Sequence, residues 1–235
     1  MTNQLLKIGI LAIQGDVSEH ADCLRRALKK LNTRKTLRVL VSRNRNKRLR
    51  QSRKRCPVNL SIHTEAVSRI SGDIVLVKNA CEIPPLDALI IPGGESTTVG
   101  KLIEMDGIAN EIKAMAKKGK PILGTCTGAI LLSREIVDCA EGQKSLGLID
   151  ISVRRNAFGR QRESFEAGVD FEGIGKFPGV FIRAPAIESV GKGAKAAASL
   201  GEKVVGARQG NVLALAFHPE LTEDTRVHEY FLQMI

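Results

Sequence analysis

Residues 121–128 read PILGTCTG, a short apolar run that leads into a cysteine with a glycine two positions away on either side. The glycines permit a tight, strained turn and a close approach between the strand and the helix that follows it. G-x-C-x-G at the end of a strand is the pattern of a nucleophile elbow, here with Cys126 as the nucleophile. A helix N-terminus beside the sulfur favours the reactive thiolate. The stretch therefore predicts a nucleophilic thiol at the carboxyl edge of a sheet, although a buried cysteine in an ordinary turn gives the same pattern.

Patterns typical of strands and helices alternate around this turn. Short apolar runs typical of strands lie at residues 7–13, 73–77 and 88–91. Apolar residues at helical spacing lie at residues 18–31, and a longer helix is expected over residues 98–118. This alternation predicts βαβ units, which form a mostly parallel central sheet with flanking helices.

The pattern changes beyond Leu146. Short apolar runs are separated there by Gly and Pro, without long helical stretches: LGLIDISV, GVFIRAP, KVVGAR and NVLALAF. These runs predict antiparallel strands added to the same sheet, and residues 225–234 predict a closing helix. The expected fold class is α/β, with a mostly parallel central sheet, flanking helices and added antiparallel strands. Residues 1–235 are expected to form a single domain.

The formal net charge of +11 comes from one segment. Residues 34–55 hold eleven of the 36 Lys and Arg and no acidic residue, so the remaining 213 residues carry 25 charges of each sign. The segment has no aromatic residue, which excludes base stacking and leaves only salt-sensitive contact with phosphates. Binding of RNA or an anionic surface is therefore a minor hypothesis about this segment, and a solvated loop is the alternative.

Composition also excludes several classes of protein. No apolar run approaches the roughly 18 residues that a membrane-spanning helix needs, and the first residues lack the features of a signal peptide. The five cysteines are odd in number and never two residues apart, which argues against a disulfide framework and against a zinc site. We expect a cytoplasmic protein with reduced cysteines and no membrane partner.

Two further segments are expected at the same sheet edge as Cys126. HPE at residues 218–220 follows an apolar run, so His218 and Glu220 would stand together at the end of a strand. A thiolate needs a base, and the base needs a group that fixes its tautomer, so these residues form a candidate triad with Cys126. PGGESTT at residues 92–98 exposes backbone N–H groups to a ligand and can cap a helix. Each pattern alone also fits a surface pair or a glycine-rich turn, but the three together predict a ligand site.

On these residues the chain resembles class I, triad-type glutamine amidotransferases, and within them the glutaminase subunits of pyridoxal 5'-phosphate synthase. The shared blocks occur in the family's order and cover nearly the whole chain apart from about residues 32–72. They are AIQGDVSEH at 12–20, IIPGGESTT at 90–98, GTCTG at 124–128, RNAFGRQ at 155–161, SFE at 164–166, VFIRAP at 180–185, RQG at 208–210 and AFHPELTED at 216–224. The RNAFGRQ and FIRAP blocks distinguish these subunits from glutaminase domains that serve nucleotide, tryptophan or histidine synthesis.

The resemblance implies a flavodoxin-like fold and hydrolysis of L-glutamine to L-glutamate and ammonia. The ammonia would be channelled to a TIM-barrel synthase subunit in a hetero-oligomer. Cys126 would be the nucleophile of the triad with His218 and Glu220, and the backbone N–H groups of Gly94 and Thr127 would form the oxyanion hole. The residues implied to bind L-glutamine are Gly94, Glu95, Ser96, Arg155, Ile182 and Arg183. No metal and no organic cofactor is implied, because pyridoxal phosphate is the product of the complex.

The chain departs from the family pattern at two places. Position 127 is Thr where the family usually has Ala; activity is expected to survive because the implied contact is a backbone N–H, although the branched side chain could crowd the elbow. The larger departure is a basic insertion at about residues 32–72. Residues 37–41 within it could themselves be a strand, which leaves the register of the second strand open.

The sequence leaves open the role of His20 and a second possible function. His20 belongs to the QGDVSEH block and is either a contact to the synthase or a structural histidine on the first helix. His63 and His228 are expected to be surface residues. Because the insertion could distort the early sheet, a non-catalytic scaffold in the same complex is the alternative to an active glutaminase.

Overall fold

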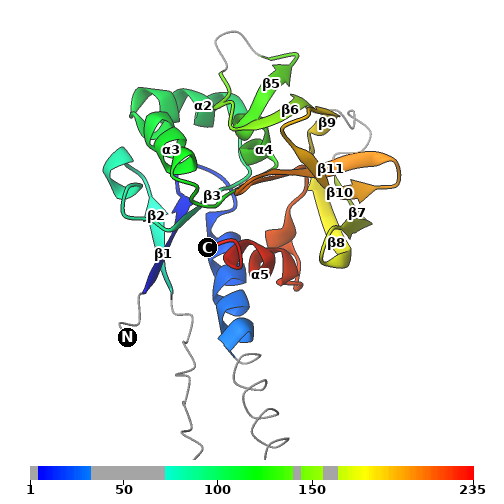
Figure 1. Cartoon of the computed structure of the whole chain (residues 1–235), viewed down its shortest axis with the longest axis horizontal. Coiled ribbons are helices and arrows are strands. Elements are labelled where there is room, and N and C mark those ends of the chain that lie inside the picture. The colour runs from blue at the N-terminus through cyan, green and yellow to red at the C-terminus, as the bar shows by residue number, and fades with distance from the viewer. Residues whose placement is uncertain (1–4, 33–71, 140–143, 156–163) are drawn as a thin grey trace, which may run out of the picture.

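The computed structural model describes residues 5–32, 72–139, 144–155 and 164–235. Its main feature is a sheet of nine strands (Figure 1). These strands are β1 (Leu6–Leu11), β2 (Gly72–Val77), β3 (Ala88–Ile91), β4 (Ile122–Thr125), β7 (Ser164–Phe171), β8 (Gly175–Ile182), β10 (Lys195–Leu200), β11 (Lys203–Gln209) and β12 (Val212–Leu215). The basic segment 34–55, the strand pattern at 37–41 and His63 lie outside the described residues.

The sheet joins a parallel half to an antiparallel half. Its strand order is β2-β1-β3-β4-β12-β11-β10-β7-β8. The pairs from β2 to β12 are parallel, and those from β12 to β8 are antiparallel. The predicted α/β class with added antiparallel strands is confirmed. The NVLALAF run forms β12, which pairs antiparallel with β11 as expected and also pairs parallel with β4, so it is the strand where the two halves meet.

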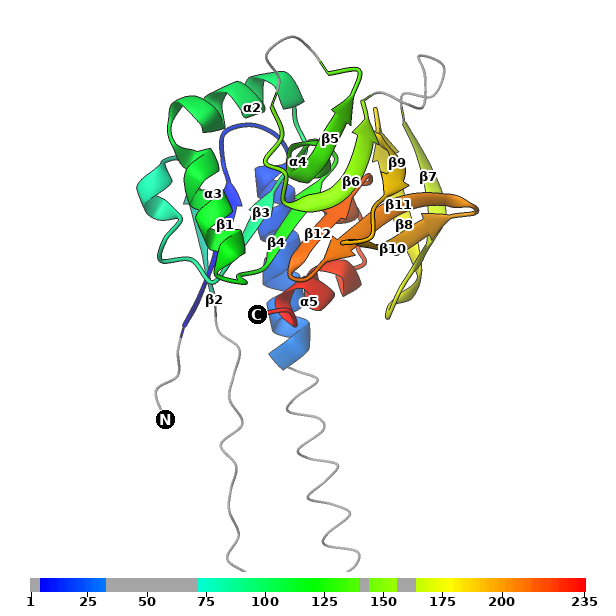
Figure 2. The same cartoon turned by 45° about the horizontal axis from the view of Figure 1, so that its top comes forward.

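A second sheet of three strands lies beside the first. It contains β5 (Ser133–Val137), β6 (Ile149–Arg154) and β9 (Ala186–Val190), in the order β5-β6-β9. Figure 2 shows it next to α4 and β11, both of which contact it. The expectation that LGLIDISV joins the main sheet is therefore wrong, because β6 pairs with β5 and β9 instead.

Helices cover both faces of the main sheet. They are the helix of residues 17–32, α2 (Ser96–Met105), α3 (Ile108–Lys117), α4 (Thr127–Leu132) and α5 (Arg226–Leu232), with short 3-10 turns η1 (Ala80–Glu82) and η2 (Pro219–Leu221). The single helix expected over 98–118 is two helices, because Gly107 adopts a left-handed φ of 71° between them. None of the described helices is long and apolar enough to cross a membrane.

Alternate residues of the central strands enter two separate apolar cores. In β3, Leu89 and Ile91 pack with α2, α3 and α4, whereas Ala88 and Ile90 pack with the helix of residues 17–32 and with α5. Figure 1 shows the blue helix and the red α5 on the face away from α2 and α3. Because side chains of a strand point alternately to either face, a continuous apolar run is what a sheet covered on both faces requires.

The glycines of the elbow allow β4, α4 and β3 to pack closely. A Cβ atom on Gly128 would lie 2.1 Å from the carbonyl oxygen of Ile91, and one on Gly124 would lie 2.5 Å from the carbonyl carbon of Gly128. Neither contact can be relieved by rotating a flexible side chain, because the atoms met belong to the backbone. The close approach therefore depends on glycine at both positions.

Gly128→Ala should lower the free energy of unfolding by about 1–3 kcal/mol, the usual cost of overpacking a core. The measurement is urea unfolding followed by circular dichroism. Gly168→Ala is the matched control, because a Cβ at Gly168 would meet nothing within 4 Å. Equal stability of the two variants would contradict this view of the elbow.

Candidate functional site

Cys126 stands at the sharp turn between β4 and α4. Its backbone has φ 50° and ψ −102°, a conformation that a residue with a side chain adopts at a cost of about 1–3 kcal/mol. The Cys126 N–H donates to the carbonyl of Leu215 at 2.8 Å, which ties the turn to β12. Its Sγ lies 3.9 Å from the carbonyl oxygen of Ile182. The thiol is thus held beyond the carboxyl ends of β4 and β12, as the elbow pattern predicts.

His218 and Glu220 follow β12 and form a short buried pair. Nδ1 of His218 lies 2.7 Å from Oε1 of Glu220, and both residues are almost fully buried. Because a carboxylate only accepts hydrogen bonds, Nδ1 carries the proton. Nε2 of His218 is buried and has no hydrogen-bond partner within the described part of the chain. In the neutral form of this ring, only Nε2 carries a lone pair that can act as a base.

A second carboxylate, that of Asp16, approaches the same imidazole. Its Oδ2 lies 3.2 Å from Nδ1 of His218. Burial lowers the pKa of His218, but the side chains of Asp16, Cys126 and Glu220 outweigh burial and raise it above its ordinary value. The hydrogen bond to His218 in turn lowers the pKa of Asp16. The imidazolium is therefore stabilised by two carboxylates.

Asp16 was not predicted from the sequence as a site residue. The available signal was its place directly after Gly15 in the loop that ends the first strand, at the carboxyl edge of the sheet. Asp16, His218 and Glu220 also form the one group among the described residues whose ligand atoms lie close enough to hold a metal ion. Because the two carboxylates already share the Nδ1 proton, the ion pairs account for this group without a metal.

The glycine loop after β3 packs against the elbow and the base. Gly94 has φ 147°, and a Cβ on Gly93 would lie 2.6 Å from Cε1 of His218. The hydroxyl of Thr127 donates to the carbonyl of Gly94, and the Glu95 N–H donates to Oε1 of Gln14 at 3.1 Å. The Thr127 side chain therefore links the two segments that hold the predicted oxyanion donors.

Three predicted glutamine-binding residues lie around the start of α2. Glu95 caps the helix by accepting from the N–H groups of Thr97 at 3.0 Å and Thr98 at 2.7 Å. Hydrogen bonds from the side chain of Thr98 and from these N–H groups lower the pKa of Glu95 to about 2. Nη2 of Arg155 lies 3.5 Å from Oε1 of Glu95, and Ser96 is buried as the first residue of α2. Glu95 therefore caps α2, in addition to its predicted role in binding glutamine.

Ile182 and Arg183 lie at the end of β8, beside the thiol. The side chains of both are exposed, and Arg183 has a left-handed φ of 42°. The carbonyl oxygen of Ile182 faces the thiol of Cys126. The structure places these two predicted residues at the open side of the elbow.

His20 and His228 lie behind the triad, both fully buried. The expectation that His228 is a surface residue is wrong. It lies on the inward face of α5 with Val227 and Phe231, and its Nε2 is 3.0 Å from Nδ1 of His20. The apolar residues at helical spacing around His228 were the signal that the sequence offered. His20 is buried within this chain, 3.1 Å from the hydroxyl of Thr125.

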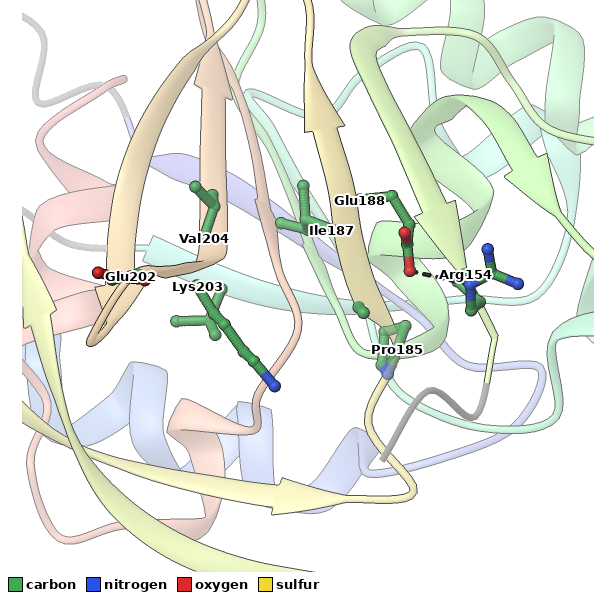
Figure 3. Close-up of a pocket in the computed structure, with 9 residues that line it drawn as sticks. Arg154, Pro185, Ile187, Glu188, Glu202, Lys203 and Val204 are labelled. Carbon is green, nitrogen blue, oxygen red and sulfur yellow. Dashed lines mark hydrogen bonds and ion pairs between the residues drawn. The ribbon is translucent and has the colours of Figure 1, made fainter. Parts of the chain in front are cut away.

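A separate cavity of about 530 Å³ lies between β9 and β11 (Figure 3). Its lining includes the ion pair between Nε of Arg154 and Oε1 of Glu188, which are 2.9 Å apart. It contains none of the three triad residues. The geometry around Cys126, and not this cavity, therefore defines the candidate active site.

Comparison with protein families identifies the group to which the chain belongs. Residues 58–235 match the model of the SNO glutamine amidotransferase family, a range that includes the elbow and the His218–Glu220 pair. The chain belongs to this family. The resemblance inferred from the sequence blocks is confirmed by this match.

Curated relatives agree with this assignment. The chain is 44% identical over 231 residues to the pyridoxal 5'-phosphate synthase subunit PdxT of Archaeoglobus fulgidus, covering 97% of this chain and 98% of that protein. It is 45% identical over 233 residues to PdxT of Methanosarcina barkeri, covering 98% of both. It is 51% identical over 175 residues to PdxT of Dehalococcoides mccartyi, covering 73% of this chain and 90% of that protein.

Solved structures show the same fold. A crystal structure of a glutamine amidotransferase is 41% identical and superposes with a TM-score of 0.73, with 97% of each chain covered. The structure of PurLQS from Thermotoga maritima, at 14% identity, has a TM-score of 0.59 and covers 98% of this chain and 99% of that one. At that identity the second likeness concerns the fold alone.

Glu95→Ala should lower the free energy of unfolding by about 0.5–2 kcal/mol, because α2 loses its cap. The ordinary pKa of Glu95 is 4.5 and its folded value about 2, so the contribution is present above pH 4.5 and is lost as the pH falls through 2. Urea unfolding at several pH values measures it. Glu104→Ala, on the exposed side of the same helix, is the control and should change stability little. If the difference in unfolding free energy between wild type and Glu95→Ala stayed the same at low pH, the capping role of the Glu95 carboxylate would be contradicted.

Proposed function

We propose that this chain is the glutaminase subunit of a pyridoxal 5'-phosphate synthase, which hydrolyses L-glutamine to L-glutamate and ammonia. The observation that carries the proposal is the buried pair of His218 and Glu220, together with Cys126, a cysteine at a nucleophile elbow whose side chain interacts with His218. Membership of the SNO glutamine amidotransferase family supports L-glutamine as the substrate.

Cys126 attacks the side-chain amide carbon of glutamine as a thiolate. Its proton passes to Nε2 of His218, and the imidazolium that forms is stabilised by Glu220 and Asp16. The oxyanion of the tetrahedral intermediate accepts hydrogen bonds from the backbone N–H groups of Gly94 and Thr127. Each such donor contributes about 3 kcal/mol to a transition state of this kind.

The intermediate then collapses in two steps. His218 gives its proton to the departing nitrogen, so that ammonia leaves and a glutamyl thioester remains on Cys126. His218 next removes a proton from water, which attacks the thioester and releases glutamate and the free thiol. The same nitrogen acts in both directions because Nδ1 keeps the proton that it donates to Glu220 and Asp16, so only Nε2 gains and loses a proton.

The residues around the elbow suit the α-amino and α-carboxyl groups of glutamine. Arg155 and Arg183 complement the carboxylate, and Glu95 complements the ammonium. Gly94, Ser96 and Ile182 complete the proposed substrate site. The Arg155–Glu95 contact at 3.5 Å shows that two of these charges already lie together.

The partner we propose is a TIM-barrel synthase subunit that receives the ammonia in a hetero-oligomer, as the names of the PdxT relatives support. We place the complex in the cytoplasm. All four cysteines in the described part of the chain are free, as a reducing compartment requires. Binding of anionic surfaces or RNA by residues 34–55 stays a prediction, since that segment lies outside the described residues.

Cys126→Ala should reduce glutamate release at least about a thousandfold, because the nucleophile is lost. The assay measures glutamate and ammonia from L-glutamine with the synthase subunit present. Cys139→Ala is the control, since Cys139 is an exposed free cysteine. Unchanged glutamate release by Cys126→Ala would refute the assignment of the nucleophile. A wild-type chain that binds the synthase without releasing ammonia would instead identify the non-catalytic scaffold.

A further inference from the structure

A chain of buried side chains leads from the triad into the helical layer behind it. Nε2 of His20 lies 3.4 Å from Oε2 of Glu220 and 3.1 Å from the hydroxyl of Thr125. Nδ1 of His20 lies 3.0 Å from Nε2 of His228. Nδ1 of His228 in turn lies 3.1 Å from Sγ of Cys23. Glu220 is thus connected through two imidazoles to a thiol on the helix of residues 17–32.

The far oxygen of the Glu220 carboxylate depends on this chain. Oε1 of Glu220 accepts a hydrogen bond from His218. Oε2 is buried, and no described residue makes a hydrogen bond of ordinary geometry to it. Nε2 of His20 is the donor atom that approaches it, at 3.4 Å, and the same nitrogen also contacts the hydroxyl of Thr125 at 3.1 Å. A buried carboxylate oxygen without a donor is costly, so the position of His20 Nε2 is significant.

The protons of this chain can be ordered in only two ways. His20, His228 and Cys23 have exposed fractions of 0%, and burial lowers the pKa of both histidines and raises that of Cys23 to about 12. All three groups are therefore neutral near pH 7, and each imidazole carries one proton. Either every N–H and S–H points toward Glu220, or every donor points away from it.

The Glu220 carboxylate selects the first order. A carboxylate cannot donate, so only a proton on His20 Nε2 stabilises Oε2. His20 Nδ1 then accepts from His228 Nε2, and His228 Nδ1 accepts from the Cys23 thiol, which satisfies each ring nitrogen along the chain. Nothing in this arrangement touches the residues proposed to bind glutamine.

We propose that His20, backed by His228 and Cys23, is a positioning residue of the triad that donates from Nε2 to the Glu220 oxygen left free by His218. The proposal rests on the proposed function, in which Glu220 orients His218. Held from both sides, the carboxylate keeps its plane and its charge, and His218 keeps the tautomer that exposes Nε2.

A pair of substitutions at His20 tests this role. The amide of Gln reaches the place of Nε2 and can donate there, whereas the shorter Asn cannot. His20→Asn should lower kcat by about 10- to 100-fold, as expected when a buried charge loses a hydrogen bond, and leave KM nearly unchanged. His20→Gln should stay within about threefold of wild type because the donor is retained.

The pH profile provides a readout that a merely structural role would not move. Without a donor at Oε2 the pKa of Glu220 rises, so the acid limb of kcat/KM should shift to higher pH in His20→Asn and not in His20→Gln. The other groups that act on Glu220 or on the chain are His218, Asp16, Arg26, Lys30 and Asp224. None of these is changed in the two variants.

The assays use the full chain with its synthase subunit, with urea unfolding of each variant alongside. Leu24→Val, a fully buried change on the same helix, is the control for lost packing and should leave kcat and the pH profile unchanged. Wild-type kcat and pH profile in His20→Asn would overturn the proposal. Equal losses of kcat in His20→Asn and His20→Gln would also overturn it, because the donor would then be irrelevant. If the wild-type chain released no more glutamate than Cys126→Ala, the proposed function would be refuted instead.

Discussion

Parallel pairing of β4 with β12 at the centre of the sheet sets the geometry on which the rest of the site depends. Thr125 and Leu215 are partners at the ends of these strands, so the chain that leaves each strand emerges at the same edge. Cys126 follows one strand and His218 soon follows the other. β3, on the other side of β4, delivers the glycine loop to the same edge. Three segments distant in sequence therefore meet because their strands are neighbours.

Local patterns in the sequence predicted the elements of the parallel half well. The run ALII at β3 is apolar throughout because both faces of the sheet are covered, and Pro92 follows its last residue. The same patterns carried no information on pairing partners, which is why β6 was expected in the wrong sheet and the parallel pairing of β12 with β4 was not foreseen. The break between α2 and α3 was missed because apolar residues recur on both sides of Gly107, and this pattern was interpreted as one continuous helix.

The triad and its glycine loop could be expected from the sequence because each lies in a short motif of its own. Asp16 and the buried pair of His20 and His228 offered only weak signals of position, since their importance arises from contacts across more than a hundred residues. His228 stands between Arg226 and Glu229, and that charged surrounding concealed its place on the inward face of α5. The groups around the His218–Glu220 pair are thus brought together by the fold, and no single motif contains them.

Gly72, the first described residue after the basic segment, lies far from the candidate site. Gly72 pairs with Leu6 at the amino ends of β2 and β1, whereas the triad gathers beyond the carboxyl ends of the strands. Six residues of strand, about 20 Å, separate these two edges. β2 keeps its full register with β1 despite the extra residues before it. A change in the length of the chain before β2 would therefore enter at the edge of the sheet opposite the candidate site.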